Sequence, residues 1–217
     1  MFLFCIFFAI AFIPITIMLP TKKIGKVKKD KEKGQILISN HYSNFDAIVL
    51  DIKLGKRICF LGKKELFNNK ISKWFFENVT GSVPVDRGTT DIKATKKILE
   101  LLKNKKTIGI FPEGTRNKTE EEKFEAKGGA CVFAIKSKTP IIPMWLVHKP
   151  KVFRRNVLLI GEPFELSEFY GEKLSKETIA KASEVLTNKM LELKNAYEEK
   201  QLEKAIIKKI KKDKKNK

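Results

Sequence analysis

Residues that bind metals or form disulfides are scarce in this chain of 217 residues. There are only two histidines, His41 and His148, and three cysteines, Cys5, Cys59 and Cys131, with no Cys-x-x-Cys pair. Two histidines exclude a histidine-rich metal site, and the odd, scattered cysteines are typical of buried reduced thiols. The chain has no internal repeat, which excludes a repeat architecture.

Acidic residues are few compared with basic ones. Forty-five Lys and Arg against 25 Asp and Glu give a net charge of +20. This balance favours negatively charged partners, namely nucleic acid, anionic lipid or phosphorylated substrates. The excess is concentrated in two flanks, with seven Lys in residues 22–33 and nine in residues 200–217. We therefore look for an active site between these flanks.

The first residues form a long apolar run. Residues 2–19 contain no charge, and their length of eighteen is near the lower limit for crossing a bilayer. No basic segment precedes the run and no small-residue cleavage site follows it, which excludes a signal peptide. Pro14 and Pro20 also permit a shallow, interfacial pose, and a buried core helix is the alternative. The Lys residues that follow favour the cytoplasmic side, so we expect a membrane anchor with the catalytic domain on the cytoplasmic side of the cell membrane.

The middle of the chain alternates between short β-rich runs and longer helical ones. Predicted strands cover 35–39, 57–61, 83–85, 107–111, 141–147 and 157–160, and predicted helices cover 90–103 and 176–207. Alternation of this kind predicts an α/β layered domain with a mostly parallel or mixed sheet flanked by helices, preceded by an N-terminal membrane helix. The expected organisation is an anchor at 1–20, a basic linker at 21–34, the main domain at 35–200 and a frayed or surface-lying Lys-rich tail at 201–217.

The most informative motif is Asn-His-Tyr-Ser-Asn-Phe-Asp at residues 40–46. It lies between a predicted strand and the apolar run 47–54, where α/β folds often hold active groups. In one continuous helix His41 and Asp46 would lie about 140° apart, but in a turn that leads into a helix they can meet. A carboxylate on one imidazole nitrogen leaves the other free to take a proton. The pair is therefore either a general base for an alcohol, or a His that caps a helix N-terminus and an Asp that balances the helix dipole.

Two further motifs also follow predicted strands. Phe-Pro-Glu-Gly-Thr-Arg at residues 111–116 predicts a tight turn with exposed backbone N–H groups. Arg116 adds donors that match phosphate oxygens, and Glu113 either pairs with that Arg or accepts a bond from a substrate hydroxyl. The other motif, residues 81–88, contains Arg87 at a strand end. Each motif alone is also compatible with an ordinary surface turn.

Together, one His and two Arg at strand ends suit acyl transfer to an alcohol that carries a phosphate. The motifs resemble, in order and spacing, the 1-acylglycerol-3-phosphate acyltransferase (lysophosphatidic acid acyltransferase) family of glycerolipid acyltransferases. The resembling blocks are His-x-x-x-x-Asp in 40–46, the second block in 81–87, Glu-Gly-Thr-Arg in 111–116, its usual sequel in 124–130 and the proline-containing block in 139–143. The resemblance covers about residues 35 to 146.

The resemblance implies transfer of an acyl chain from acyl-CoA or acyl-carrier protein to the sn-2 hydroxyl of 1-acylglycerol 3-phosphate, forming phosphatidic acid in phospholipid biosynthesis. It implies His41 as the base and Asp46 as its orienting partner. The residues implied at the acceptor's glycerol phosphate are Arg87, Glu113, Gly114, Thr115 and Arg116. It implies no metal and no bound cofactor, because the acyl donor is itself a substrate. The expected partners are lysophosphatidate, the acyl donor and an anionic membrane surface, without nucleic acid.

Other interpretations remain open. The alternative acceptors are glycerol 3-phosphate and another lysophospholipid. A nucleic-acid-binding protein explains the charge but not the apolar N-terminus, and the basic runs lack interleaved aromatics. A non-catalytic basic protein tethered to a membrane has no use for His41 and Asp46. Lys63 and Lys64 are candidates for a phosphate contact or solvated side chains, and the aromatic residues 74–76 are candidates for the bilayer interface or the core.

Overall fold

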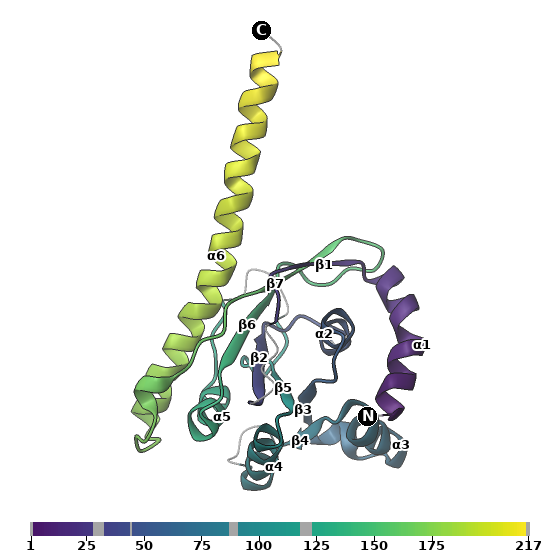
Figure 1. Cartoon of the computed structure of the whole chain (residues 1–217), viewed down its shortest axis with the longest axis vertical. Helices are drawn as coiled ribbons and strands as arrows, with labels where there is room; N and C mark the ends of the chain where they lie inside the picture. Colours follow the sequence, from purple (N-terminus) through teal and green to yellow (C-terminus); the bar gives the residue numbers. More distant parts are fainter. Residues whose placement is uncertain (1, 28–32, 44, 87–90, 118–122, 216–217) are drawn as a thin grey trace.

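A seven-stranded mixed sheet forms the centre of the protein (Figure 1). The computed structural model describes residues 2–27, 33–43, 45–86, 91–117 and 123–215. The strands are β1 (Thr21–Ile24), β2 (Gln35–Ser39), β3 (Cys59–Lys63), β4 (Val83–Val85), β5 (Thr107–Ile110), β6 (Ile141–Leu146) and β7 (Asn156–Ile160). Their order is β1-β7-β6-β2-β5-β3-β4, and every adjacent pair is parallel except β6 and β7. The predicted α/β layered fold with a mixed sheet is confirmed.

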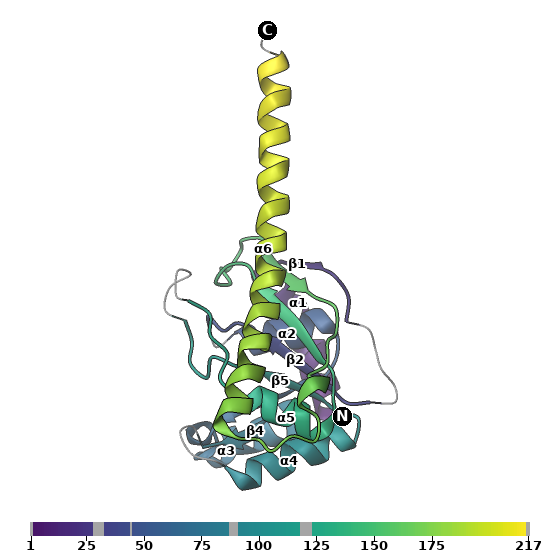
Figure 2. The same ribbon diagram turned by 90° about the vertical axis from the view of Figure 1, so that its left-hand side faces the viewer.

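Helices cover both faces of this sheet (Figures 1 and 2). The longer helices are α1 (Phe2–Met18), α2 (Asp46–Leu54), α4 (Ile92–Lys103), α5 (Gly129–Ser137) and α6 (Lys176–Lys215). Shorter helical segments are η1 (Lys64–Phe67), α3 (Lys70–Trp74), the π-helix η2 (Phe75–Thr80) and η3 (Ser167–Phe169). α2 lies on one face with α1 outside it, whereas α4, α5 and α6 lie on the other.

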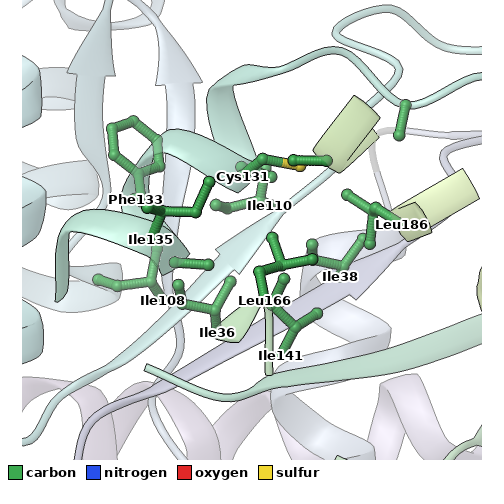
Figure 3. Packing of buried hydrophobic residues seen from close by; sticks show 14 of the residues in the cluster. Ile36, Ile38, Ile108, Ile110, Cys131, Phe133, Ile135, Ile141, Leu166 and Leu186 are labelled. Carbon is green, nitrogen blue, oxygen red and sulfur yellow. The ribbon is translucent and has the colours of Figure 1, made fainter. Parts of the chain in front are cut away.

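Successive side chains of β2 point to opposite faces of the sheet and so contribute to both core layers. Ile36 and Ile38 pack with the cluster that contains α4, α5 and α6, while Leu37 packs with Leu50 of α2 in the other cluster. All four side chains are fully buried. Figure 3 shows the first layer, where the isoleucines of β2 and β5 lie beside the side chains of α5. A strand covered on both faces reads as a continuous apolar run, which is why the sequence revealed it.

The N-terminal segment forms a helix, but the expected membrane helix is not confirmed. α1 has 17 residues and contains Pro14, which lacks the N–H that would bond to the preceding turn. Within the described ranges, no helix combines the length and the apolar character needed to cross a membrane. Many apolar side chains of α1 are exposed, including Phe2 at 76%, Ile10 at 71% and Ile13 at 64%.

Two other segments differ from expectation. Residues 21–24, inside the predicted linker, form the parallel edge strand β1 beside β7. The predicted tail is helical as far as Lys215, because α6 continues past the domain through Lys- and Glu-rich sequence without Gly or Pro (Figure 1). Its first half packs on the sheet through Ala182, Leu186 and Met190, as its apolar pattern predicted.

Parallel pairing brings the candidate motifs to one edge of the sheet. β2, β5, β3 and β4 are neighbours that all run in the same direction. Their carboxyl ends therefore lie along a single edge, and the segments that follow them are the ones singled out in the sequence. This is the edge where open α/β sheets bind their ligands.

Candidate active site

The loops after β2 and β5 are joined through the backbone of His41. Its N–H donates to Glu113 Oε1 at 3.0 Å, and its carbonyl accepts from the N–H of Asn117 at 2.8 Å. Glu113 and Asn117, which follow His41 by 72 and 76 positions in the chain, are thus held next to it. The His-x-x-x-x-Asp loop and the Glu-Gly-Thr-Arg loop therefore form one structural unit.

His41 and Asp46 meet, as a turn leading into a helix predicts. His41 Nδ1 lies 2.8 Å from Asp46 Oδ2. Asp46 is the first residue of α2, and its side chain is turned back toward the loop that precedes the helix. Phe45, at the N-cap of this helix, makes no side-chain capping bond, and Asp46 lies in the first turn, where its charge also balances the helix dipole.

The carboxylate of Asp46 is buried and held by several donors. Oδ2 accepts the N–H groups of Tyr42 and Ser43 at 2.6 and 2.7 Å, in addition to the His41 ring. Oδ1 accepts the hydroxyl of Ser43 at 2.9 Å. Asp46 has no exposed surface, and backbone N–H groups compensate a buried carboxylate well. The acid is thus fixed in position and can orient the imidazole.

The imidazole ring of His41 is held on its faces as well as at Nδ1. It stacks on Phe111 with ring centroids 4.1 Å apart and an interplanar angle of 14°, and Phe111 stacks in turn on Phe60. The side chain keeps 14% of its surface exposed. No described residue forms a hydrogen bond with Nε2, so this nitrogen is available to a substrate.

Residues 111–117 form a tight turn after β5. The N–H of Gly114 donates to Phe111 O at 3.1 Å, and its φ of 71° lies in the left-handed region that favours glycine. Glu113 is buried and accepts the N–H of His41, whereas Thr115 and Arg116 on the same turn are exposed. Of the predicted acceptor-binding residues, Glu113, Gly114, Thr115 and Arg116 therefore lie on the loop that contacts His41.

Arg87 lies outside the described residues, so its predicted position at the site stays a prediction. The strand that precedes it, β4, ends at the same edge, beside β3. Lys63 ends β3 there and Lys64 follows it, and both are exposed. Basic side chains at the end of β3 thus lie at this edge in addition to Arg116.

Asn40 is a residue whose contribution sequence reasoning missed. Its Nδ2 donates to Leu146 O at 2.9 Å, and its Oδ1 accepts the N–H of Leu146 at 2.8 Å. The side chain is completely buried. It ties the start of the His41 loop to the end of β6, and the signal in the sequence was a polar residue directly after a buried strand.

An apolar cavity of about 340 Å³ adjoins the Gly114 turn. Phe111, Pro112 and Gly114 form one wall, next to Lys127. Most of the remaining lining is apolar and comes from β3, β4, β5 and α5: Leu61, Val85, Ile110, Ala130, Val132 and Phe133. The cavity therefore offers an apolar ligand a place beside the loop that is bonded to His41.

The described residues contain no group of three or more His, Cys, Asp or Glu side chains suited to hold a metal ion. The chemistry that this edge offers is that of an imidazole oriented by a carboxylate, with basic side chains and an apolar cavity nearby. Such an arrangement is typical of enzymes that activate a hydroxyl group for attack on an acyl carbon.

Comparison with known proteins agrees with this class. Residues 21–147 match the family model described as acyltransferase. The chain belongs to the acyltransferase family and is an enzyme of that family.

Several relatives carry the same name. The chain is 30% identical over 184 residues to the 1-acyl-sn-glycerol-3-phosphate acyltransferase of Bacillus subtilis, covering 82% of this chain and 90% of that protein. It is 33% identical to the enzyme of that name from Helicobacter pylori, covering 58% of this chain and about half (53%) of that protein. The crystal structure of the 1-acyl-sn-glycerophosphate acyltransferase from Thermotoga maritima has a TM-score of 0.63 at 24% identity, covering 90% of this chain and 77% of that one, and shows the same fold.

Proposed function

We propose that this chain transfers an acyl chain from acyl-CoA or acyl-carrier protein to the sn-2 hydroxyl of 1-acylglycerol 3-phosphate, which produces phosphatidic acid for phospholipid biosynthesis. The observation that carries the proposal is the contact between His41 Nδ1 and Asp46 Oδ2 at 2.8 Å, in a ring stacked on Phe111 whose Nε2 has no hydrogen-bond partner among the described residues. The names of the relatives support the acceptor, since those described above are acyltransferases of 1-acylglycerol 3-phosphate.

In the proposed reaction, His41 Nε2 takes the proton of the acceptor hydroxyl while its oxygen forms a bond to the thioester carbonyl carbon. Asp46 stabilises the imidazolium that results. The tetrahedral oxyanion then collapses, the carbon–sulfur bond breaks, and the imidazolium returns its proton to the leaving thiolate. General-base assistance of this kind contributes about 10²–10⁴-fold. No acyl-enzyme and no metal or other cofactor is required.

The acceptor's phosphate is proposed to bind at the Gly114 turn. Arg116 is exposed there and offers a planar fork of donors, and the backbone N–H of Thr115 is at hand for the phosphate or the oxyanion. Arg87, which follows β4, is proposed to act with it. Glu113 is proposed to contribute by holding the His41 backbone in place.

An acyl chain is proposed to enter the apolar cavity of about 340 Å³ beside the same turn. Burial of methylene groups is favourable by about 0.8 kcal/mol each. Because Phe111 contacts both the cavity and the His41 ring, a chain in the cavity would have its carboxyl end near the base.

The test is replacement of each histidine in turn. His41→Ala should abolish thiol release from acyl-CoA with lysophosphatidate, while His148→Ala, at an exposed position after β6, should retain normal turnover. Thermal unfolding of both variants checks that they are folded. Near-normal turnover by folded His41→Ala would refute the general-base assignment.

A panel of acceptors and donors separates the remaining candidates. Glycerol 3-phosphate and other lysophospholipids are the alternative acceptors, each to be tested with acyl-CoA and acyl-carrier protein. Positional analysis of the product decides whether the sn-2 hydroxyl is acylated. A chain that releases no thiol with any acceptor would fit the alternative of a non-catalytic, basic, membrane-tethered protein.

The proposed place of action is the surface of the cell membrane, with the catalytic domain on the cytoplasmic side. Exposed apolar side chains of α1, such as Ile10 and Ile13, are accompanied by Ile71 at 79% and Trp74 at 51% on the nearby helix α3 (Figure 1). Exposed apolar side chains with exposed lysines nearby, such as Lys70 and Lys73 on α3, suit the interface of an anionic membrane. A lipid acceptor and product also require an active site near the bilayer.

Substitution of two exposed apolar side chains of α1 tests this placement. Ile10→Ser with Ile13→Ser should reduce binding to lipid vesicles at high salt, where charge attraction is screened. The matched control is Leu202→Ser with Ile206→Ser, which removes two apolar side chains of similar exposure, 63% and 51%, from α6. Equal vesicle binding by the two double variants would refute a specific role for α1.

A further inference from the structure

A second cavity lies at the opposite edge of the sheet from His41. It has a volume of about 900 Å³ and opens between α1, η2 and α4. Cys59, Val83 and Thr107, at the first residues of β3, β4 and β5, form part of its lining. These strands are parallel and have three to five residues, so at about 3.3 Å a residue they are about 10–17 Å long, and the cavity is separate from the candidate active site.

Positive charge dominates this cavity. The cationic side chains of its lining are Lys56, Arg57, Lys97, Lys105 and Lys106. Glu77 is the acidic residue among the lining residues. Lys97 is paired at 3.2 Å with Glu100, which lies outside the lining, whereas Lys106 forms no ion pair with any described residue. The excess of cations matches a ligand with a phosphate group.

Arg57, which lines this cavity, is hydrogen-bonded to backbone carbonyls. Its Nη2 donates to the carbonyls of Glu77 and Asn78 at 3.3 and 3.0 Å, which are neutral acceptors. Its Nε is buried and has no hydrogen-bond partner among the described residues. Burial raises the pKa of nearby Asp51 to about 8, so at neutral pH that carboxyl is mostly protonated and does not cancel the guanidinium charge.

The other walls of the cavity are apolar. Cys5 and Phe8 of α1 line it on one side, and Leu101 of α4 lines it on the other. α1 also carries the exposed apolar side chains proposed to face the membrane. The cavity therefore combines cationic groups with an apolar wall, and this combination suits a ligand with a charged head and a hydrocarbon chain.

We propose that this cavity, which we call the amino-edge cavity, binds an anionic phospholipid at a site distinct from the catalytic one. The phosphate would contact Arg57, Lys97 and Lys106, and an acyl chain would lie against Cys5 and Phe8. Occupation would tether this edge of the domain to membranes that contain anionic lipid. The proposal does not rest on acyl transfer, since it requires only the cavity and its charges.

The thiol of Cys5, which lines this cavity, can report on ligand binding there. Cys5 is exposed, whereas Cys59 and Cys131 are buried and their burial raises both pKa values, that of Cys131 to about 11. Alkylation at neutral pH should therefore occur at Cys5, because the thiolate is the reactive form. Dihexanoyl phosphatidate, used as a monomer, should slow this alkylation in the full-length chain.

Charge-reversal variants locate the effect. Lys97→Glu with Lys106→Glu should weaken protection of Cys5 at least about tenfold, the loss expected when a charge-assisted contact is removed. The matched control, Lys96→Glu with Lys103→Glu, makes the same change of net charge at exposed positions of α4 outside the cavity and should bind as the unmodified chain does. Acyl transfer to monomeric substrates should be unchanged in both, since His41 lies at the other edge.

Three outcomes would overturn the proposal. Equal loss of protection in the two double variants would show attraction by net charge alone. Protection by dihexanoyl phosphatidylcholine at the same concentration would show that the phosphate monoester is not recognised. Equal protection by glycerol 3-phosphate would show a site for free phosphate esters and not for lipid. Should the first double variant unfold, Lys106→Gln with Lys103→Gln as control gives the same comparison.

Discussion

Replacement of Asp46 by Asn tests how far the charge of one buried carboxylate supports catalysis. The amide has nearly the shape of the carboxylate, and its oxygen in the Oδ2 position would still accept from His41 Nδ1 and from the N–H groups of Tyr42 and Ser43. The amide nitrogen would then face the Ser43 hydroxyl, which can accept a hydrogen bond. The geometry is kept and the negative charge is removed.

The expected loss of stability follows from these contacts. Charge-assisted hydrogen bonds are roughly twice as strong as neutral ones, a difference of about 1 kcal/mol each. Three donors to Oδ2 give about 3 kcal/mol in total, or a decrease of about 6–12 °C in Tm for a chain of this size. Thermal unfolding followed by circular dichroism measures it.

The expected loss of activity is larger. At an effective dielectric constant of about 20, two unit charges about 4 Å apart attract by about 4 kcal/mol, which corresponds to a factor of about 10³ in rate if the imidazolium forms in the transition state. Turnover of folded Asp46→Asn should therefore fall about 10²–10³-fold in the thiol-release assay, with the apparent affinity for lysophosphatidate little changed. Turnover within threefold of the unmodified enzyme, at a temperature where the variant is folded, would refute an electrostatic role for Asp46.

Three further changes have defined expectations. Asn40→Ala should lower the free energy of unfolding in urea by about 2–5 kcal/mol, because it leaves the buried N–H and carbonyl of Leu146 without their partner; a loss below about 0.5 kcal/mol would contradict the anchoring role. Burial raises the pKa of the Asp51 carboxyl from 3.8 to about 8. The protonated carboxyl therefore stabilises the fold fully below about pH 4, and this contribution is lost as pH rises through about 8. Asp51→Asn keeps an acceptor for the N–H of Ile58, so its unfolding free energy should decline less between pH 5 and about 8.5 than that of the unmodified chain; parallel pH curves would show that Asp51 does not titrate in this way. Arg116→Ala should raise the apparent Km for lysophosphatidate about 10–100-fold, as expected for a phosphate contact of about 1.5–3 kcal/mol, and an effect on the acyl donor alone would exclude that contact.

The fold class followed from sequence because the strands are covered on both faces. β2 and β4 begin and end where their apolar runs predicted, and the first half of α6 buries the apolar stripe that its sequence indicated. β3 begins two residues later than predicted, because Arg57 is bonded to the carbonyls at the end of η2 and Ile58 to the side chain of Asp51. A local apolar pattern contains no information about such distant partners.

Three elements were harder to predict, because their composition gave a weak or misleading signal of secondary structure. α5 is buried nearly all round, so it shows little amphipathic pattern. Residues 21–24 read as a charged linker, yet they pair with β7, since backbone hydrogen bonds at a sheet edge do not depend on apolar side chains. The continuation of α6 to Lys215 relies on helix propensity without burial, which the charge pattern alone did not reveal.

The sequence by itself indicated which reactive groups the protein has: a His in a His-x-x-x-x-Asp motif and an Arg in Glu-Gly-Thr-Arg, with Ser43 of the first motif interpreted as a turn residue and not as a nucleophile. Only the tertiary structure decided that His41 and Asp46 are in contact, that Glu113 holds the backbone of His41 instead of facing outward, and that Phe111 supports the imidazole ring. The reason is that these contacts join loops from strands that are far apart in the chain and adjacent in the sheet. Parallel pairing of β2 with β5 places their carboxyl ends together, and that pairing is a property of the folded sheet.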